Sequence, residues 1–159
     1  YAELFPDRVG RMVLDGAINP LLSESEQNVA QLVGFDQALK NYLSDCLSTT
    51  ECPFTGSLAD AQKRIVRFLS SLETKPIPTA DGRELTIWSA ITGIIMPMYS
   101  KSFWPALNQA FEEGFRGDGT TFIRLADTYN DRNEDGTFAT NVLEANISIS
   151  CLDLSLIHI

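Results

Sequence analysis

The residues that could carry out chemistry are few: one histidine, three cysteines and scattered carboxylates. His158, the single histidine, is the second-last residue. Asp15 follows an apolar run, Val9–Leu14, and would lie at the carboxyl end of a strand, where α/β sheets display functional groups. Asp15-Gly16 is also a common turn pair. We favour the turn and expect no catalytic role for Asp15.

Metal chemistry is not expected. Cys46 and Cys52 are separated by five residues, which fits either a small disulfide loop or two free buried thiols, and no Cys-x-x-Cys spacing suits zinc. Asp131–Gly136 copies the first half of an EF-hand calcium loop, but the twelfth position, Val142, lacks the required carboxylate. We interpret this run as a polar turn, and we expect no metal and no cofactor.

Composition limits the possible partners. The chain has 12 basic and 21 acidic residues, a net charge of −9, which argues against a nucleic-acid partner or an anionic membrane surface. The longest apolar stretch, Ile87–Tyr99, is interrupted by polar residues and a proline, so no membrane-spanning segment is expected.

The first twenty residues have an α/β pattern. Tyr1–Phe5 reads as the end of a helix, and Pro6-Asp7 breaks it. Val9–Leu14 then fits a buried parallel strand, because it is a short apolar run between turn residues.

Helices are predicted from residue 21 onward. A capping box, Ser23 to Glu26, starts the first. The second begins near Ser57, with Asp60 in its first turn, and ends before Lys75–Pro78, which is expected to be an extended link. The apolar stripes of these two helices are Leu32, Phe35, Leu39, Tyr42, Leu43 and Cys46, then Leu58, Ala61, Ile65, Phe68, Leu69 and Leu72.

Three further helices follow. The helix from about Thr86 to Pro97 is apolar on nearly all sides and is expected to be the most buried. Others are predicted from Trp104-Pro105 to about Gly114 and from about Thr121 to Tyr129. Alternation in Asn146–Leu152 favours a strand, although Val142–Ile147 also fits a helix.

This layout predicts an incomplete domain, because one confident strand cannot make a sheet. We expect residues 1–20 to be a piece of an α/β core, residues 21–140 a helical lid, and residues 141–153 a return toward the core. The chain also lacks an initiator Met, and Leu154–Ile159 matches the translated sequence of an adapter used in DNA library preparation. We therefore expect residues 154–159 to be an artefact and His158 not to be biological.

The sequence Tyr1 to Gly16 closely resembles the segment that follows the nucleophile in α/β-hydrolase-fold peptidases. Later matches point to the secreted bacterial tripeptidyl-aminopeptidase-like family, which is related to proline iminopeptidases. These matches are Cys46 with Cys52-Pro53, Asp81-Gly82-Arg83, Trp104–Leu107, Gly117–Gly119, Leu125–Tyr129 and Ala145–Asp153. The resemblance covers residues 1–153 and implies an α/β hydrolase fold fragment: a core helix end and a parallel strand, followed by the lid.

The resemblance also implies a function. The parent would be a serine exopeptidase that releases short peptides or amino acids from peptide N-termini. Its nucleophile is expected upstream of Tyr1, in a Gly-x-Ser-x-Gly turn, and its acid and histidine downstream of Asp153, so the chain alone would be inactive. Two alternatives stay open: another lidded α/β hydrolase such as an esterase, and a non-enzymatic helical binding module.

Several residues gain a role from the resemblance. It favours a Cys46–Cys52 disulfide, a secreted or cell-envelope location, and a partner for Cys151 beyond this chain. With a peptide substrate, Trp88, Tyr99 and Trp104 are candidates to line its cleft, against the alternative of ordinary helix packing. Glu112, Glu113 and Asp127 are candidates to hold a substrate α-ammonium group, although a solvated helix face is the favoured interpretation.

Overall fold

The computed structural model describes residues 1–13, 19 and 21–154. The longer helices are α1 (Glu24–Leu47), α2 (Leu58–Leu72), α3 (Ile87–Ile95), α4 (Trp104–Phe115), α5 (Thr120–Tyr129) and α6 (Val142–Leu154). Short 3-10 helices are η1 (Pro6–Arg8), η2 (Met96–Tyr99) and η3 (Lys101–Phe103), and the strands are β1 (Ile77–Pro78) and β2 (Glu84–Leu85). The described chain is mostly helical, in agreement with the helices predicted after residue 21.

Two helices begin where the sequence predicts. At the start of α1, Ser23 Oγ accepts a hydrogen bond from the Glu26 N–H at 3.3 Å, and the Glu26 carboxylate accepts one from the Ser23 N–H at 2.8 Å. Ser57 and Asp60 form the same reciprocal pair at the start of α2. These contacts satisfy backbone donors that a helix N-terminus leaves unpaired.

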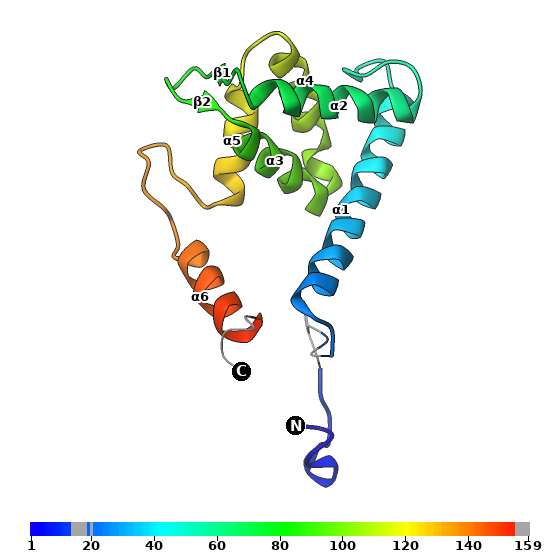
Figure 1. Ribbon diagram of the computed structural model, residues 1–159, viewed down its shortest axis with the longest axis vertical. Helices are drawn as coiled ribbons and strands as arrows, with labels where there is room; N and C mark the ends of the chain where they lie inside the picture. Colours follow the sequence, from blue (N-terminus) through cyan, green and yellow to red (C-terminus); the bar gives the residue numbers. More distant parts are fainter. Residues whose placement is uncertain (14–18, 20, 155–159) are drawn as a thin grey trace.

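The core lies among α2, α3, α4, α5 and the C-terminal half of α1 (Figure 1). Its centre is aromatic, with the Phe122 ring stacked on Phe68 at 5.5 Å and edge-on to Phe111 at 5.1 Å between centroids. Tyr42, Leu43, Leu72, Leu85 and Leu107 are also fully buried. The structure thus provides one continuous helical core.

A two-stranded antiparallel sheet lies between α2 and α3, with Ile77 opposite Leu85 and Pro78 opposite Glu84. Gly82 supplies the left-handed conformation of its turn, with φ of 82°. The sequence predicts the extended link at Lys75–Pro78 but not the pairing, because runs of two residues carry no alternation that could indicate a strand.

The predicted stripe of α1 is only partly buried. Tyr42, Leu43 and Cys46 lie in the core, whereas Leu32 is 65% exposed. The N-terminal half of α1 extends past the other helices (Figure 1), so a continuous stripe in the sequence is covered along half of its length.

The prediction that the third helix is the most buried is wrong. Helix α3 buries Ala90, Gly93 and Ile94, whereas α5, of similar length, buries five residues; the Trp88 side chain of α3 is 75% exposed. Apolar composition predicts which residues can be buried, and the position of the neighbouring helices decides which of them are.

The predicted core strand at the N-terminus is not formed in residues 9–13, and Leu14, Asp15 and Gly16 lie outside the described residues. A parallel strand needs a paired neighbour, and the sheet of the described chain consists of β1 and β2. The helix end predicted at Tyr1–Phe5 is present as a single turn, in which the Phe5 N–H donates to the Tyr1 carbonyl at 2.9 Å.

The strand predicted at Asn146–Leu152 is wrong, because this segment belongs to α6. A helix satisfies its own backbone hydrogen bonds, whereas a strand leaves them unpaired without a neighbour. Of the suspected adapter residues, 155–159 lie outside the described residues.

Cys46 and Cys52 form the expected disulfide, with Cα atoms 5.0 Å apart. It joins the last turn of α1 to the loop that leads to α2. Cys46 is 2% exposed and packs in the core. Cys151 on α6 is exposed and unpaired within the part of the chain that the structure describes.

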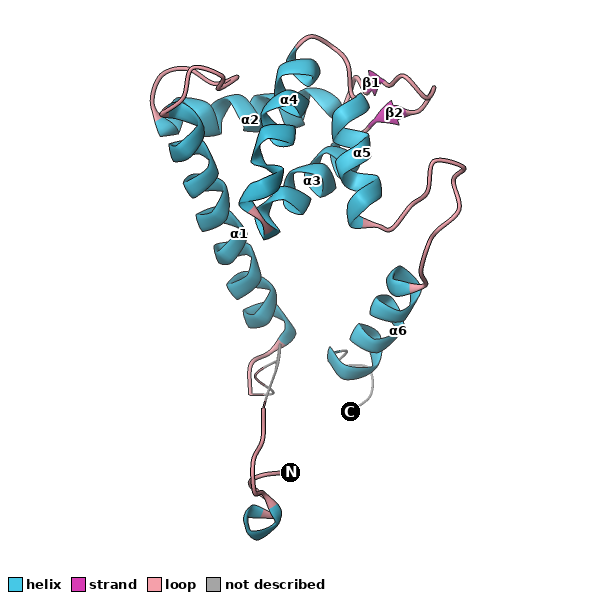
Figure 2. Cartoon of the chain, turned by 180° about the vertical axis from the view of Figure 1, so that it is seen from behind, coloured by secondary structure: helices cyan, strands magenta, loops and turns pink. Residues whose placement is uncertain are grey.

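We call α2, α3, α4, α5 and the C-terminal half of α1 the helical cluster. Two segments leave this cluster on the same side, as both views show (Figures 1 and 2). They are the N-terminal half of α1 and the helix α6, and we call them the arms. Their exposed apolar side chains are Val29, Leu32, Val33, Val142, Leu143, Ile147 and Ile149. Apolar surface gathered in this way usually has a partner.

Helices that combine the length and the apolar character needed to cross a membrane do not occur in the described ranges.

Replacing Gly93 by alanine is expected to destabilise the cluster. The added Cβ would lie 2.6 Å from the Phe122 carbonyl oxygen, a backbone atom that cannot turn away. Overpacking of this kind lowers the free energy of unfolding by about 1–3 kcal/mol, measurable by urea denaturation. Gly34→Ala in α1 is the matched control: nothing lies within 4 Å of its added Cβ, so stability should rise by about 0.5–1 kcal/mol. Equal effects of the two substitutions would contradict the close packing of α3 on α5.

Removing the disulfide is also expected to destabilise the fold. The double variant Cys46→Ala/Cys52→Ala opens a short loop, and the chain-entropy model predicts a loss of about 2 kcal/mol in unfolding free energy. The measurement is denaturant unfolding without reductant. Cys151→Ser is the control and should leave stability unchanged, because this side chain is exposed. A loss of stability in Cys151→Ser but not in the double variant would contradict the Cys46–Cys52 disulfide.

Candidate functional site

Three aromatic rings form a row between α1 and α5. Tyr99 of η2 lies between Phe35 of α1, with centroids 5.7 Å apart, and Tyr129 at the end of α5, 6.1 Å away. Tyr99 is 64% exposed and Tyr129 is 44% exposed. We call these three residues the aromatic row. Exposed rings held against one another offer a surface for an apolar or aromatic group.

The 3-10 turn η2, which contains Pro97, sets the position of Tyr99. Helix α3 ends at Ile95, and the fully buried Pro97 follows within η2. Proline cannot continue the hydrogen-bond pattern of an α-helix. The chain therefore tightens into a 3-10 turn that brings Tyr99 to the surface beside α1 and α5.

The Tyr99 hydroxyl is neutral at physiological pH. Partial burial of the side chain, together with its contact to Tyr129, raises the pKa of Tyr99 above its ordinary value. A neutral phenol can both donate and accept a hydrogen bond, so the row combines apolar faces with a polar group.

The three predicted substrate-lining residues occupy different environments. Tyr99 belongs to the aromatic row. Trp88 is largely exposed on α3, and Trp104 is 9% exposed and packs edge-on to Tyr42 with centroids 5.8 Å apart. Because the three residues are close in sequence, we expected them to line one side of a cleft. The turns at η2 and η3 instead direct Trp104 into the core.

A cavity of about 1000 Å³ lies beside the disulfide, between the C-terminal turn of α1 and α4. At its wall the buried Tyr42 hydroxyl donates to Asn108 Oδ1 at 2.6 Å, and burial raises the pKa of Tyr42. Its charged lining residues balance one another: Arg64, Lys101 and Arg116 against Asp45, Glu51 and Glu112. The substrate-lining candidate Trp104 also borders this cavity, but the sequence did not indicate the cavity itself because its lining comes from distant segments. Its balanced charge favours no class of ligand.

The three candidate carboxylates already have partners. Glu112 pairs with Arg116, Glu113 accepts from Gln109 Nε2 at 2.7 Å, and Asp127 pairs with Arg83. Glu112 lies on a solvated helix face, as the sequence suggested, whereas the Asp127 side chain is only 19% exposed.

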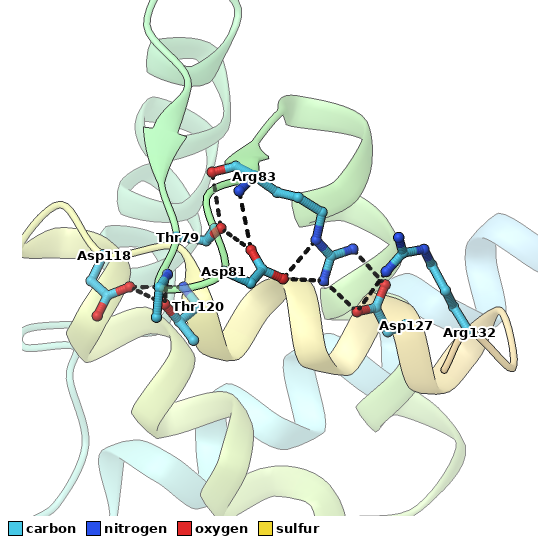
Figure 3. Close-up of polar contacts among 8 residues, drawn as sticks. Thr79, Asp81, Arg83, Asp118, Thr120, Asp127 and Arg132 are labelled. Carbon is cyan, nitrogen blue, oxygen red and sulfur yellow. Dashed lines mark hydrogen bonds and ion pairs between the residues drawn. The ribbon is translucent and has the colours of Figure 1, made fainter. Parts of the chain in front are cut away.

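The strands β1 and β2 and the turn between them form a hairpin, and Arg83 of this hairpin connects it to α5 (Figure 3). Its Nη1 and Nη2 atoms donate to the two carboxylate oxygens of Asp127 at 2.9 and 2.5 Å, and its Nε donates to Asp81 at 2.7 Å. Hydrogen bonds from Arg83 and Thr79 hold the pKa of Asp81 well below its usual range, and the two carboxylates raise the pKa of Arg83. This bidentate geometry is the strongest ion-pair arrangement that arginine makes.

The Asp131–Gly136 segment is a polar turn. The Asn133 N–H donates to the Thr137 carbonyl at 2.8 Å, and the Asp135 carboxylate accepts from the Thr137 N–H at 2.9 Å. Among the residues that the structure describes, no three His, Cys, Asp or Glu side chains lie together in a way that could hold a metal ion.

Curated proteins provide relatives along nearly the whole chain, although no family model matches it. Serine protease Hip1 of Mycobacterium tuberculosis is 34% identical over an alignment 163 residues long, which covers 96% of this chain and 31% of the relative. Carboxylesterase B of the same species is 35% identical over 152 residues, 95% of this chain and 29% of the relative. The chain thus spans about a third of the length of the curated relatives it matches. Both names denote hydrolases, so the similarity supports a serine-hydrolase family.

Replacing Asp81 by asparagine should alter the pH dependence of stability. Because the folded-state pKa of Asp81 is lowered from 3.8, its ionised form stabilises the fold above that pH, and this contribution is lost as the pH falls below it. The carboxylate is half exposed, so the effect is expected to be small. The stability difference between the wild type and Asp81→Asn should shrink progressively as the pH falls from about 5 to about 1. A difference that stays constant with pH would contradict the ion pairing.

Proposed function

We propose that this chain is the lid-bearing part of a serine hydrolase of the α/β-hydrolase type. The observation that carries the proposal is 34% identity over 96% of the chain with a relative named as a serine protease. That relative is about three times as long, so the proposal concerns a longer protein in which residues 21 to about 140 cover the active site. Residues 1–20 and 141–153 would connect this lid to the catalytic core.

The structure supports a covering role in two ways. The helices around Phe122 form a core of their own, so the cluster does not depend on other parts of a protein for its packing. The arms leave this cluster on one side (Figure 2). Their apolar side chains are exposed. Packing against an α/β core would remove that apolar surface from water.

The chemistry would take place outside this chain. A serine upstream of Tyr1 would attack the substrate carbonyl, a histidine after Asp153 would transfer the proton, and backbone amides would stabilise the oxyanion. The contribution of this chain would be substrate selection. The aromatic row would form part of the apolar roof of the cleft.

A peptide is the substrate class that we propose, with release of amino acids or short peptides from the N-terminus. The relative named as a serine protease supports peptide chemistry. An ester substrate is the second candidate, because a relative named as a carboxylesterase is equally similar. Glu112 and Asp127 are paired with arginines within the lid, which leaves them less available to a substrate α-ammonium group, whereas Glu113 is bonded to the neutral Gln109 amide and keeps its charge.

The Cys46–Cys52 disulfide is consistent with an oxidising compartment. We therefore propose a secreted or cell-envelope location for the longer protein. Since Cys151 is exposed on α6, a partner cysteine beyond this chain would fit the same environment.

The test is to extend the reading frame in the source DNA and express the longer protein. We expect a Gly-x-Ser-x-Gly sequence within about fifteen residues upstream of Tyr1, and hydrolysis of aminoacyl-arylamides that a serine-directed inhibitor abolishes. The 159-residue chain is the matched control and should show no turnover. Absence of the serine turn upstream, or inhibitor-sensitive turnover by the 159-residue chain, would refute the proposal. Ester hydrolysis without amide hydrolysis would decide for the second candidate.

A further inference from the structure

We propose that Arg83 is a positioning residue for the aromatic row, acting through Asp127 of α5. The role of the row in substrate selection rests on the proposed function. The coupling of Arg83 to the row rests on the geometry of the chain itself, which can be tested separately.

Arg83 is held on the hairpin side before it reaches α5. Thr79 Oγ1 donates to Asp81 Oδ1 at 2.5 Å, and the Arg83 N–H donates to the same oxygen at 3.1 Å. The Thr79 N–H also donates to the Arg83 carbonyl at 3.1 Å. The neighbouring Leu85 side chain is fully buried. The guanidinium group therefore extends from a fixed turn and not from a free loop.

The hairpin contacts α5 near the first and the last turn of this helix (Figure 3). At the start of the helix, the Ala80 N–H donates to Thr120 Oγ1 at 2.9 Å, and the Gly119 N–H donates to the Pro78 carbonyl at 3.0 Å. Near its end, Arg83 makes its bidentate contact with Asp127. The last turn of α5 is thereby tied to the hairpin, where helix ends otherwise fray.

Asp127 also fixes the chain that follows α5. Its backbone carbonyl accepts from the Asn130 N–H at 3.2 Å and from the Arg132 N–H at 2.9 Å, and the Arg132 guanidinium lies 3.8 Å from its carboxylate. The carboxylate side chain is 19% exposed, so the pair is partly shielded from solvent. One residue therefore joins the hairpin, the helix end and the following turn.

Tyr129 lies two residues after Asp127, which is roughly 200° around a helix of 3.6 residues per turn. Asp127 thus faces the hairpin while Tyr129 faces Tyr99 on the other side, with ring centroids 6.1 Å apart. A displacement of the last turn of α5 would move the Tyr129 ring away from Tyr99. Through Tyr99, it would also change the contact with Phe35.

The first test uses the whole 159-residue chain labelled with fluorotyrosine. It has four tyrosines, Tyr1, Tyr42, Tyr99 and Tyr129, whose ¹⁹F signals are assigned by single Tyr→Phe variants. In Arg83→Gln and in Asp127→Asn, the signals of Tyr99 and Tyr129 should shift or broaden while the signal of the core residue Tyr42 stays. Arg83→Lys should restore them only partly, because lysine lacks the planar fork.

Controls separate this coupling from general loss of structure. Arg116→Gln removes a guanidinium that pairs with Glu112 on an exposed face of α4 and should leave Tyr99 and Tyr129 unchanged. The double variant Arg83→Gln/Asp127→Asn should perturb them by less than the sum of the two single variants, because both single variants remove the same Arg83–Asp127 contact. Unchanged Tyr99 and Tyr129 signals in Arg83→Gln, or an equal shift of Tyr42, would overturn the proposal.

The second test uses the longer protein. Arg83→Gln should lower kcat/KM by roughly 10- to 100-fold, mainly through a higher KM, and Tyr99→Ala should give the same pattern. If the longer protein hydrolyses its substrates and both Arg83→Gln and Tyr99→Ala leave kcat/KM unchanged, the row does not select the substrate, and that part of the proposal is refuted. If the longer protein has no hydrolase activity, the proposed function fails, while the ¹⁹F signals still decide whether Arg83 positions the row.

Discussion

The packing of the helices in this chain depends on the position of Phe122. Its backbone carbonyl lies so close to Gly93 of α3 that a Cβ at that position would be 2.6 Å away, and its ring lies 3.0 Å from the place of a Cβ at Gly114 of α4. The same ring contacts Phe68 and Phe111. Two residues without side chains thus allow α3 and α4 to approach α5 closely, and dense aromatic packing fills the remaining space.

This packing accounts for the division of the apolar residues into two groups. The core is complete with residues from α2 to α5, the hairpin and the C-terminal half of α1. Tyr99, Tyr129, Trp88 and the apolar residues of the arms are left at the surface. Under the proposed function, a catalytic core together with its substrate would cover these residues.

The sequence predicted those features that depend on neighbouring residues. Serine and acidic residues at the capping spacing located the starts of α1 and α2, and the resemblance indicated the disulfide of Cys46 and Cys52. Local sequence patterns did not predict the features that depend on residues far away in the chain. Asn146–Leu152 has the alternation of a strand but becomes a helix, since the sheet of the described chain contains only β1 and β2 and no strand pairs with this segment. The contact of Arg83 with Asp127 spans 44 residues, so no local pattern could indicate it.

The aromatic row lies between two elements that are fixed by different interactions. The disulfide ties the C-terminal turn of α1 to the loop before α2, and Arg83 ties the end of α5 to the hairpin. Phe35 and Tyr129, which flank Tyr99, come from these two helices. By contrast, α6 follows a turn whose hydrogen bonds are local, such as Asn133 to Thr137 and Thr140 to Asp131. The row is therefore shaped where α1 meets the cluster, before any substrate or core is present. A surface formed in advance loses little conformational entropy on binding, and under the proposed function this favours the row over α6 as the part of the chain that distinguishes one substrate from another.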